Sequence, residues 1–219
     1  MERGAGWTNA LATTPLTGFA HGASGVAHSL LAMAETTGKS HFRETAAEAL
    51  EYERSLFDPA RGNWPDLREL QPREEAAGRE FLMAWCHGAP GVGLARLTAL
   101  HHLSDDRLRE EAQTAVRTTT QRGMLDNESL CHGSLGNLEL LSAAGNLFSD
   151  DALIDRVYRS AGTILARQRE RGWRCGVSDG VETPGLLEGL SGIGYGLLRL
   201  ADRQRVPSVL APGPSLAAV

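Results

Sequence analysis

The chain reads WCHGAPGVGL at residues 85–94, a short loop with one cysteine and one histidine that opens an apolar, glycine-containing helix. Three further stretches share this register, and each places a histidine or glutamate before Gly-x-x-Gly at a helix start. They read GFAHGASGVA at residues 18–27, LCHGSLGNLE at residues 130–139 and LEGLSGIGYG at residues 187–196. Four copies at uneven spacing indicate an internal repeat whose extra length lies in surface connections.

Each loop precedes a segment rich in leucine, alanine and glycine. These segments span residues 26–34, 92–103, 135–147 and 190–200. Because they carry few charges, we expect inner helices that are buried nearly all round. Charged outer helices follow, with predicted N-caps at Ser40, Ser104 and Ser149. Stacked hairpins of this kind form an open solenoid or a closed α/α toroid, and both bring the loops together at one end.

The length and charge of the chain limit the classes of protein to consider. At 219 residues it is long enough for one folded body with a sizeable core. Its net charge of -5 comes from 27 acids and 22 bases, and Lys39 is the only lysine. No basic cluster suggests a nucleic-acid partner. Without a secretion signal or an apolar run of roughly 18 residues, we expect a cytoplasmic protein with no membrane span.

Three cysteines, an odd number, disfavour a disulfide framework and favour metal or thiol chemistry. Two of them, Cys86 and Cys131, lie with His132 on loops that the hairpin arrangement brings together. Two thiolates and one imidazole can hold Zn2+ and leave its fourth position open, as in catalytic sites. Spacing alone leaves two small buried thiols as an equal alternative, because no Cys-x-x-Cys is present. Cys175 has no matching loop position, and we expect it to be structural.

As an ordered set, these motifs resemble the cyclase domain of the lanthionine synthetase C-like (LanC-like) family. The similarity is greatest to the C-terminal cyclase domain of class II lanthipeptide synthetases. The matching stretches read GFAHG at 18–22, NWPDLR at 63–68, AWCHGAPG at 84–91, CHG at 131–133 and GLSGIGYGLLRL at 189–200. The resemblance covers residues 15–210, with an N-terminal extension at 1–14 and a tail at 211–219. It implies an all-α fold, a partial α/α toroid with about four glycine-rich inner-helix repeats.

The resemblance also implies a site and a reaction. Cys86, Cys131 and His132 would bind Zn2+. His21 would be a proton-transfer residue beside the metal, and His87 would line the same site. The reaction implied is addition of a peptide cysteine thiolate to dehydroalanine or dehydrobutyrine in a dehydrated lanthipeptide precursor, which forms lanthionine or methyllanthionine. Zinc would favour the thiolate, and His21 would protonate the resulting enolate or first take the thiol proton.

Two interpretations of the function stay open, because the family's toroid has seven hairpins and only about four inner-helix starts occur here. The chain is a cyclase or a cyclase fragment. Alternatively, it is a non-catalytic partner that binds zinc or peptide and needs a dehydratase or an N-terminal toroid half from another chain. A glycoside-processing toroid is disfavoured, since no carboxylate pair lies on the loops. Glu188, in the histidine position of the fourth loop, is interpreted as a solvated first-turn acid.

Overall fold

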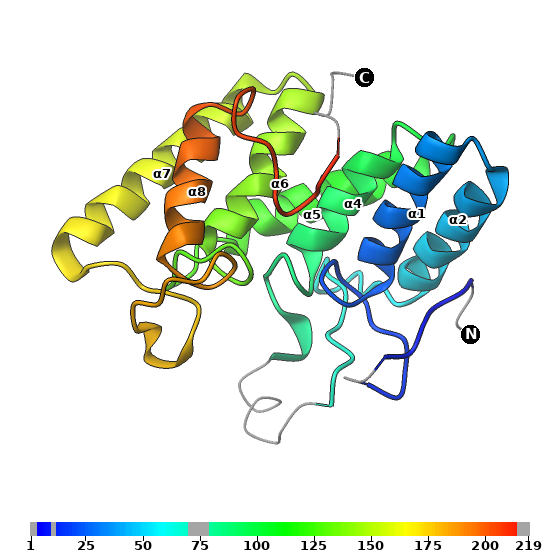
Figure 1. The fold of residues 1–219 in the computed structure, drawn as a ribbon, viewed down its shortest axis with the longest axis horizontal. Coiled ribbons are helices and arrows are strands. Elements are labelled where there is room, and N and C mark those ends of the chain that lie inside the picture. The colour runs from blue at the N-terminus through cyan, green and yellow to red at the C-terminus, as the bar shows by residue number, and fades with distance from the viewer. Residues whose placement is uncertain (1–3, 10–11, 70–78, 214–219) are drawn as a thin grey trace. The chain divides into compact units, whose positions relative to one another are not determined.

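The computed structural model describes residues 4–9, 12–69 and 79–213. Within these ranges it contains seven α-helices and two short 3-10 helices, and its β-bridges are isolated rather than joined into strands. The all-α prediction is therefore confirmed. Two compact units, residues 1–118 and 119–219, divide the chain (Figure 1).

Parts of the predicted extension and tail, residues 1–3, 10–11 and 214–219, lie outside the described residues. The predicted boundaries of the central region, at 15 and 210, stay predictions. Among the helices that are described, none is both long and apolar enough to cross a lipid bilayer.

The first unit is built on a helical hairpin, α1 (Ala23–Thr37) and α2 (Ser40–Ser55). These two helices lie side by side in Figure 1, and α4 (Ala89–Ala99) packs against α1. Helix α5 (Arg107–Arg122) follows, and the boundary between the units falls within it. Small side chains, mostly alanine with a few leucines, make up the core between α1 and α2, which lets the two helices approach closely.

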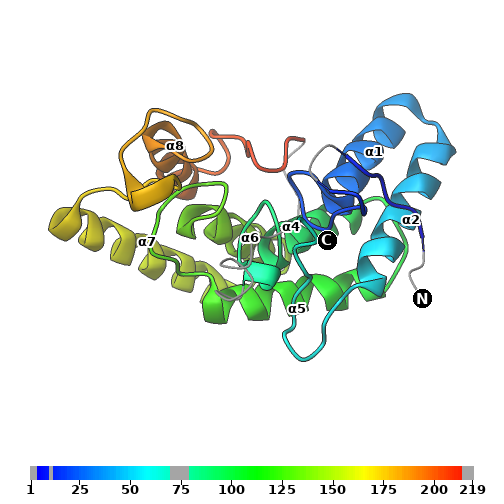
Figure 2. The same ribbon diagram turned by 90° about the horizontal axis from the view of Figure 1, so that it is seen from below.

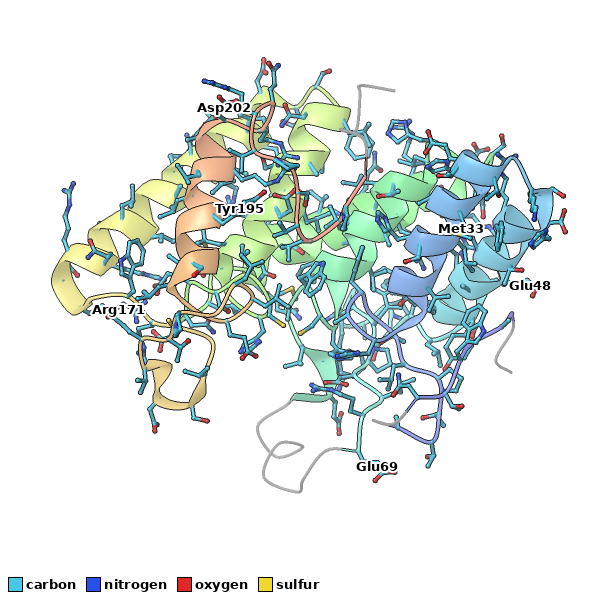
Figure 3. All side chains as sticks on the ribbon, viewed as in Figure 1. Met33, Glu48, Glu69, Arg171, Tyr195 and Asp202 are labelled. Carbon is cyan, nitrogen blue, oxygen red and sulfur yellow. The ribbon has the colours of Figure 1, made fainter. Side chains whose placement is uncertain are left out.

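The second unit repeats the hairpin with α6 (Ser134–Leu147) and α7 (Asp151–Arg171), and α8 (Leu190–Ala201) packs on both. The connection between α7 and α8 carries a 3-10 turn at Ser178–Gly180, visible in Figure 2. After α8 the chain turns back along it. The hydroxyl of Tyr195 on α8 donates a hydrogen bond of 2.8 Å to a carbonyl of this returning segment (Figure 3).

Two of the four inner helices are buried nearly all round, as predicted. In α4 every residue except Thr98 is buried, and in α6 every residue except Asn146. Helices α1 and α8 instead bury one face, and Met33 and Leu198 are 45% and 63% exposed. For these two helices the prediction is wrong, because a low charge content identifies an apolar helix but not how many neighbours it has.

Two of the three outer helices, α5 and α7, begin at carboxylates rather than at the predicted serines. Asp150 caps α7, and its side chain accepts the N–H of Leu153 at 2.9 Å. Before α5, Asp105 accepts the N–H of Arg107 at 3.1 Å. Helix α2 begins at Ser40 with no side-chain cap. A carboxylate accepts a stronger hydrogen bond than a hydroxyl and interacts favourably with the helix dipole, so the neighbouring acids take the capping position.

The second glycine of each repeat lets a loop carbonyl lie against the first turn of an inner helix. A Cβ at any of the four positions would overlap the carbonyl oxygen of a residue in the preceding loop. The glycine–carbonyl pairs are Gly25–Phe19, Gly91–Trp85, Gly136–Leu130 and Gly192–Leu186. These glycines have the backbone role expected from the sequence, and the cause is close approach rather than positive φ.

Candidate functional site

The two Cys-His-Gly loops lie one in each unit. Cys86 and His87 come directly before α4 in the first unit, and Cys131 and His132 come directly before α6 in the second. In both loops the glycine is the N-cap and no side chain caps the helix. The thiol and the imidazole are therefore not used to cap the helix that each loop begins.

Hydrogen bonds to backbone atoms hold the loop of Cys131 and His132 in place. The N–H groups of Leu130 and Cys131 both donate to the carbonyl of Leu187, at 3.1 and 2.8 Å. The side-chain amide of Asn127 donates to the carbonyl of His132 at 3.2 Å. These bonds tie the loop of the Cys-His pair to the loop before α8. They fix the positions of the Cys131 thiol and the His132 imidazole.

The imidazole of His132 is oriented by the chain that follows α7. Its Nε2 lies 2.5 Å from the carbonyl oxygen of Gly176. Because a carbonyl oxygen only accepts hydrogen bonds, Nε2 carries a proton, and in the neutral ring the lone pair therefore lies on Nδ1. Glu188 Oε1 lies 3.9 Å from this Nδ1, so the fourth-loop acid lies beside His132 although the sequence suggested only a solvated residue. Nδ1 of the neutral ring is therefore the atom that would bind a metal ion.

The Cys131–His132 pair has the chemistry and the spacing of two zinc ligands. The ligand atoms of the two side chains lie within 4.8 Å of one another, and both residues are half-buried. Zinc binds thiolate sulfur at about 2.3 Å and imidazole nitrogen at about 2.0–2.1 Å, so two ligands of one ion must lie this close. A thiol beside an imidazole that donates a hydrogen bond from its other nitrogen is a typical zinc arrangement. The residues present in this unit fit the ion.

In the first unit, the loop of Cys86 pairs with the loop before α1 in the same way. The carbonyl of Cys86, a buried residue, accepts the N–H groups of Phe19 and Ala20 at 3.0 and 3.3 Å. Phe19 and Ala20 hold the same places relative to their histidine as Leu130 and Cys131 do in the second unit. Both units therefore use one register, in which a loop donates two amides to the carbonyl just before the next histidine or glutamate.

His87 is buried and faces two oxygen atoms. Its Nδ1 lies 3.2 Å from the carbonyl of Thr17 and 3.8 Å from Asp66 Oδ1. Burial lowers the pKa of His87 below its usual value, and the opposing charge of Asp66 offsets this only in part. The imidazole is therefore neutral at pH 7. With Nδ1–H donating to Thr17, the lone pair lies on Nε2.

Asp66 is a buried carboxylate in the NWPDLR stretch, where the sequence assigned it no role of its own. Its side chain accepts hydrogen bonds from Arg68, at 3.0 Å from Nε and 2.6 Å from Nη2. Burial favours a raised pKa for Asp66, but the bonds from Arg68 and the nearby His87 outweigh it and hold the pKa below its ordinary value. Asp66 is thus an ionised group beside His87.

His21 lies near His87, as the prediction of a shared site requires. The ring centroids are 6.4 Å apart, and His21 is exposed. Its loop is anchored by the fully buried Glu53, which accepts the N–H of Gly18 at 2.7 Å and the hydroxyl of Ser24 at 2.5 Å. Arg96 of α4 donates to the same carboxylate at 2.8 Å. The loop of His21 is therefore linked to the helix that follows Cys86 and His87.

A family model described as lanthionine synthetase C-like protein matches residues 3–211, nearly the whole chain. The chain belongs to this LanC-like family. The family resemblance inferred from the motifs is therefore confirmed, and the matched range takes in both Cys-His-Gly loops and the loop of His21.

Relatives and a solved structure of the LanC-like family agree with this assignment. The lacticin 481/lactococcin biosynthesis protein LcnDR2 of Lactococcus lactis subsp. lactis is 28% identical over 206 residues, 89% of this chain and 21% of the relative. The nisin biosynthesis protein NisC of the same subspecies is 29% identical over 189 residues, 80% of this chain and 42% of the relative. Nisin cyclase matches with a TM-score of 0.64 at 25% identity, over 87% of this chain and 47% of that one.

The structural match confirms the predicted LanC-like fold of helical hairpins. It also shows that the chain spans less than half the length of the cyclase structure and of the relatives it matches. Three residues that lie beside the predicted site histidines were missed in the sequence: Thr17 and Asp66 at His87, and Gly176 at His132. Only Asp66 lay in a stretch that the motifs had singled out.

Proposed function

We propose that the chain is a zinc-dependent lanthionine- and methyllanthionine-forming cyclase, or the cyclase fragment of one, that acts on a dehydrated lanthipeptide precursor. The observation that carries the proposal is the family match over residues 3–211, which includes every residue assigned a role in the site. The printed names of two relatives, proteins of lacticin 481 and nisin biosynthesis, support the same substrate class. Because the chemistry needs reduced thiols, a cytoplasmic location is part of the proposal.

The proposed metal ligands are Cys86, Cys131 and His132, the last through Nδ1. Support comes from the position of both cysteines on equivalent loops and from the orientation of His132 by Gly176. A bound zinc ion would lower the pKa of a coordinated substrate thiol and so raise the fraction of thiolate at neutral pH.

The two remaining histidines move protons in the proposed reaction. Neutral His87 accepts the thiol proton at Nε2, since its Nδ1–H is held by Thr17. The sulfur bonds to the β-carbon of the dehydro residue, and the double-bond electrons move onto the α-carbon and its carbonyl as an enolate. His21, exposed beside His87, then delivers a proton to the α-carbon. No atom is lost, so the product has the mass of the dehydrated precursor.

An alternative proposal is a non-catalytic member that binds zinc or peptide and needs another polypeptide, a dehydratase or a further LanC-like segment, for activity. The observation that favours it is coverage, since the chain spans 47% of nisin cyclase. The two proposals differ in what the isolated chain does with a dehydrated peptide.

Metal content and ring closure together test the proposal. We expect about one zinc per chain in the purified protein, lost in Cys131→Ala and retained in Gly162→Ala, a substitution in α7 where an added Cβ meets nothing within 4 Å. Ring closure adds no mass, so alkylation of the thiols that remain in the peptide reports it. Zinc with loss of alkylatable thiol supports the cyclase. Zinc without that loss favours the non-catalytic alternative, and folded protein without zinc contradicts the proposed site.

A further inference from the structure

We propose that residues 174–176, named here the strap, are a positioning element of the metal site that selects the ring nitrogen His132 presents. This inference rests on the proposed zinc site and goes beyond its ligands. The strap follows α7, which ends at Arg171 (Figure 3), and runs past His132 toward the 3-10 turn before α8. The contact with His132 comes from the backbone carbonyl of Gly176.

The first step concerns Nε2 of His132, which cannot bind a metal ion while it donates a hydrogen bond to Gly176. The bond from Nε2 to the carbonyl of Gly176 is 2.5 Å long, which makes Nε2 the protonated nitrogen. A free histidine samples both neutral tautomers, so a fixed acceptor on one nitrogen leaves the other as the only lone pair. Acceptors of this kind fix the orientation and raise the basicity of metal-binding imidazoles.

The second step is that the strap itself is held by a buried carboxylate. Glu128, 2% exposed at its side chain, accepts the N–H of Arg174 through Oε2 at 2.8 Å. The N–H of Glu128 donates to the carbonyl of Arg174 at 2.9 Å. Arg171, at the end of α7, donates to Oε1 of the same carboxylate at 2.7 Å. The strap is therefore fixed to the segment that leads into Cys131, only three residues before it.

The third step is a closed ring of hydrogen bonds that includes Cys131 and His132, the two proposed metal ligands of this unit. The N–H of Gly176 donates to the carbonyl of Glu188 at 2.7 Å, and the N–H of Cys131 donates to the carbonyl of Leu187 at 2.8 Å. With the His132–Gly176 bond, these links join the Cys-His pair, the loop before α8 and the strap into one ring. Displacing the strap would move His132 relative to Cys131.

The fourth step explains why the strap has glycine at 176. A Cβ built there would lie 2.7 Å from Ser129 Oγ and 2.8 Å from His132 Nε2, closer than real Cβ atoms come to other heavy atoms. The backbone conformation at Gly176 is not the left-handed one, so the requirement for glycine comes from the imidazole and from the serine. Any side chain at this position displaces His132.

The test compares Gly176→Ala with Gly162→Ala, a matched substitution in α7 where an added Cβ meets nothing within 4 Å. The zinc dissociation constant is measured by competition with a chromophoric chelator, and circular dichroism checks the helix content of each sample. We expect Gly176→Ala to bind zinc about 10–100-fold more weakly and Gly162→Ala to match the parent. Equal affinities for Gly176→Ala and the parent would overturn the proposal.

A second readout needs no metal and uses a variant that adds no atom beside His132. In metal-free protein, the 15N shifts of the His132 ring, assigned with His132→Gln, should show the Nε2–H tautomer. Glu128→Gln, which loosens the strap, should shift His132 toward a mixture of tautomers. An Nδ1–H tautomer in the parent refutes the strap's role. A parent with the expected tautomer and no zinc affinity instead refutes the proposed function and the metal role together.

Discussion

The two histidines in equivalent positions of the Cys-His-Gly loops keep their lone pairs on opposite ring nitrogens. His87 donates from Nδ1 to Thr17 and keeps its lone pair on Nε2, whereas His132 donates from Nε2 to Gly176 and keeps it on Nδ1. His87 is buried, with a lowered pKa, and His132 is half-buried beside Cys131. Equal sequence positions thus carry different chemistry, because in each loop a backbone carbonyl decides which nitrogen of the neutral ring carries the lone pair.

The first prediction separates the two histidines. His132→Gln should lose zinc, because its Nδ1 is the proposed ligand atom. His87→Gln should retain zinc and lower the rate of ring closure by about 10²–10⁴-fold, the usual effect of removing a general base. Elemental analysis and the thiol-alkylation assay measure the two effects on the same preparations. Loss of zinc from His87→Gln would contradict the division of roles.

At the scale of the element, each inner helix begins against a loop carbonyl that leaves no space for a side chain. The same geometry recurs at four glycines that are far apart in the chain. The second glycine of the repeat therefore sets where the loop packs on the helix. The same loop carries the reactive side chain. Helix α8 offers a matched comparison, since it contains both a constrained glycine and an unconstrained one.

Gly192→Ala should destabilise the protein, and Gly194→Ala should stabilise it. A Cβ at Gly192 would overlap the carbonyl of Leu186, so the loop or the helix must shift, at a cost of about 1–3 kcal/mol. A Cβ at Gly194 meets nothing within 4 Å, and alanine there gains about 0.5–1 kcal/mol of helix propensity. Urea unfolding followed by circular dichroism measures both free energies. Similar values for the two variants would show that the loop is not held this way.

The helices and their order could be predicted from the sequence, while the surroundings of the site could not. The repeat of histidine and paired glycines at apolar segments locates the inner helices, because close approach to a carbonyl requires glycine. Thr17 and Gly176 act through backbone carbonyls, which every residue has, so no side-chain pattern marks them. Asp66 reaches His87 only once the chain folds back. The ligand assignments to Cys86, Cys131 and His132 stay predictions.

At the scale of the whole molecule, each unit contains a buried arginine–glutamate pair that joins an inner helix to a second helix. Arg96 of α4 meets Glu53 at 2.8 Å, and both side chains are fully buried. Arg199 of α8 contacts Glu139 of α6 through two bonds of 2.8 Å. Such pairs are costly to break, since removal of one partner leaves a desolvated charge. The two pairs differ in their surroundings, because Arg96 also contacts Glu111 at 2.6 Å and Glu53 also holds the loop of His21.

This difference yields the last prediction, a comparison of Glu53→Gln with Glu139→Gln. Glu139→Gln removes the carboxylate that pairs with Arg199 and should lower the free energy of unfolding by about 3–5 kcal/mol. Glu53→Gln should also lower it, by at most this amount, because Arg96 keeps its ion pair with Glu111 at 2.6 Å. Only Glu53→Gln should also change the imidazole resonances of His21, because the bonds of Glu53 to Gly18 and Ser24 fix that loop. Urea unfolding and NMR of the histidine rings give the two readouts. Unchanged His21 signals in a folded Glu53→Gln variant would mean that the loop keeps its position without the carboxylate. Glu53 would then serve only as the buried ion-pair partner of Arg96.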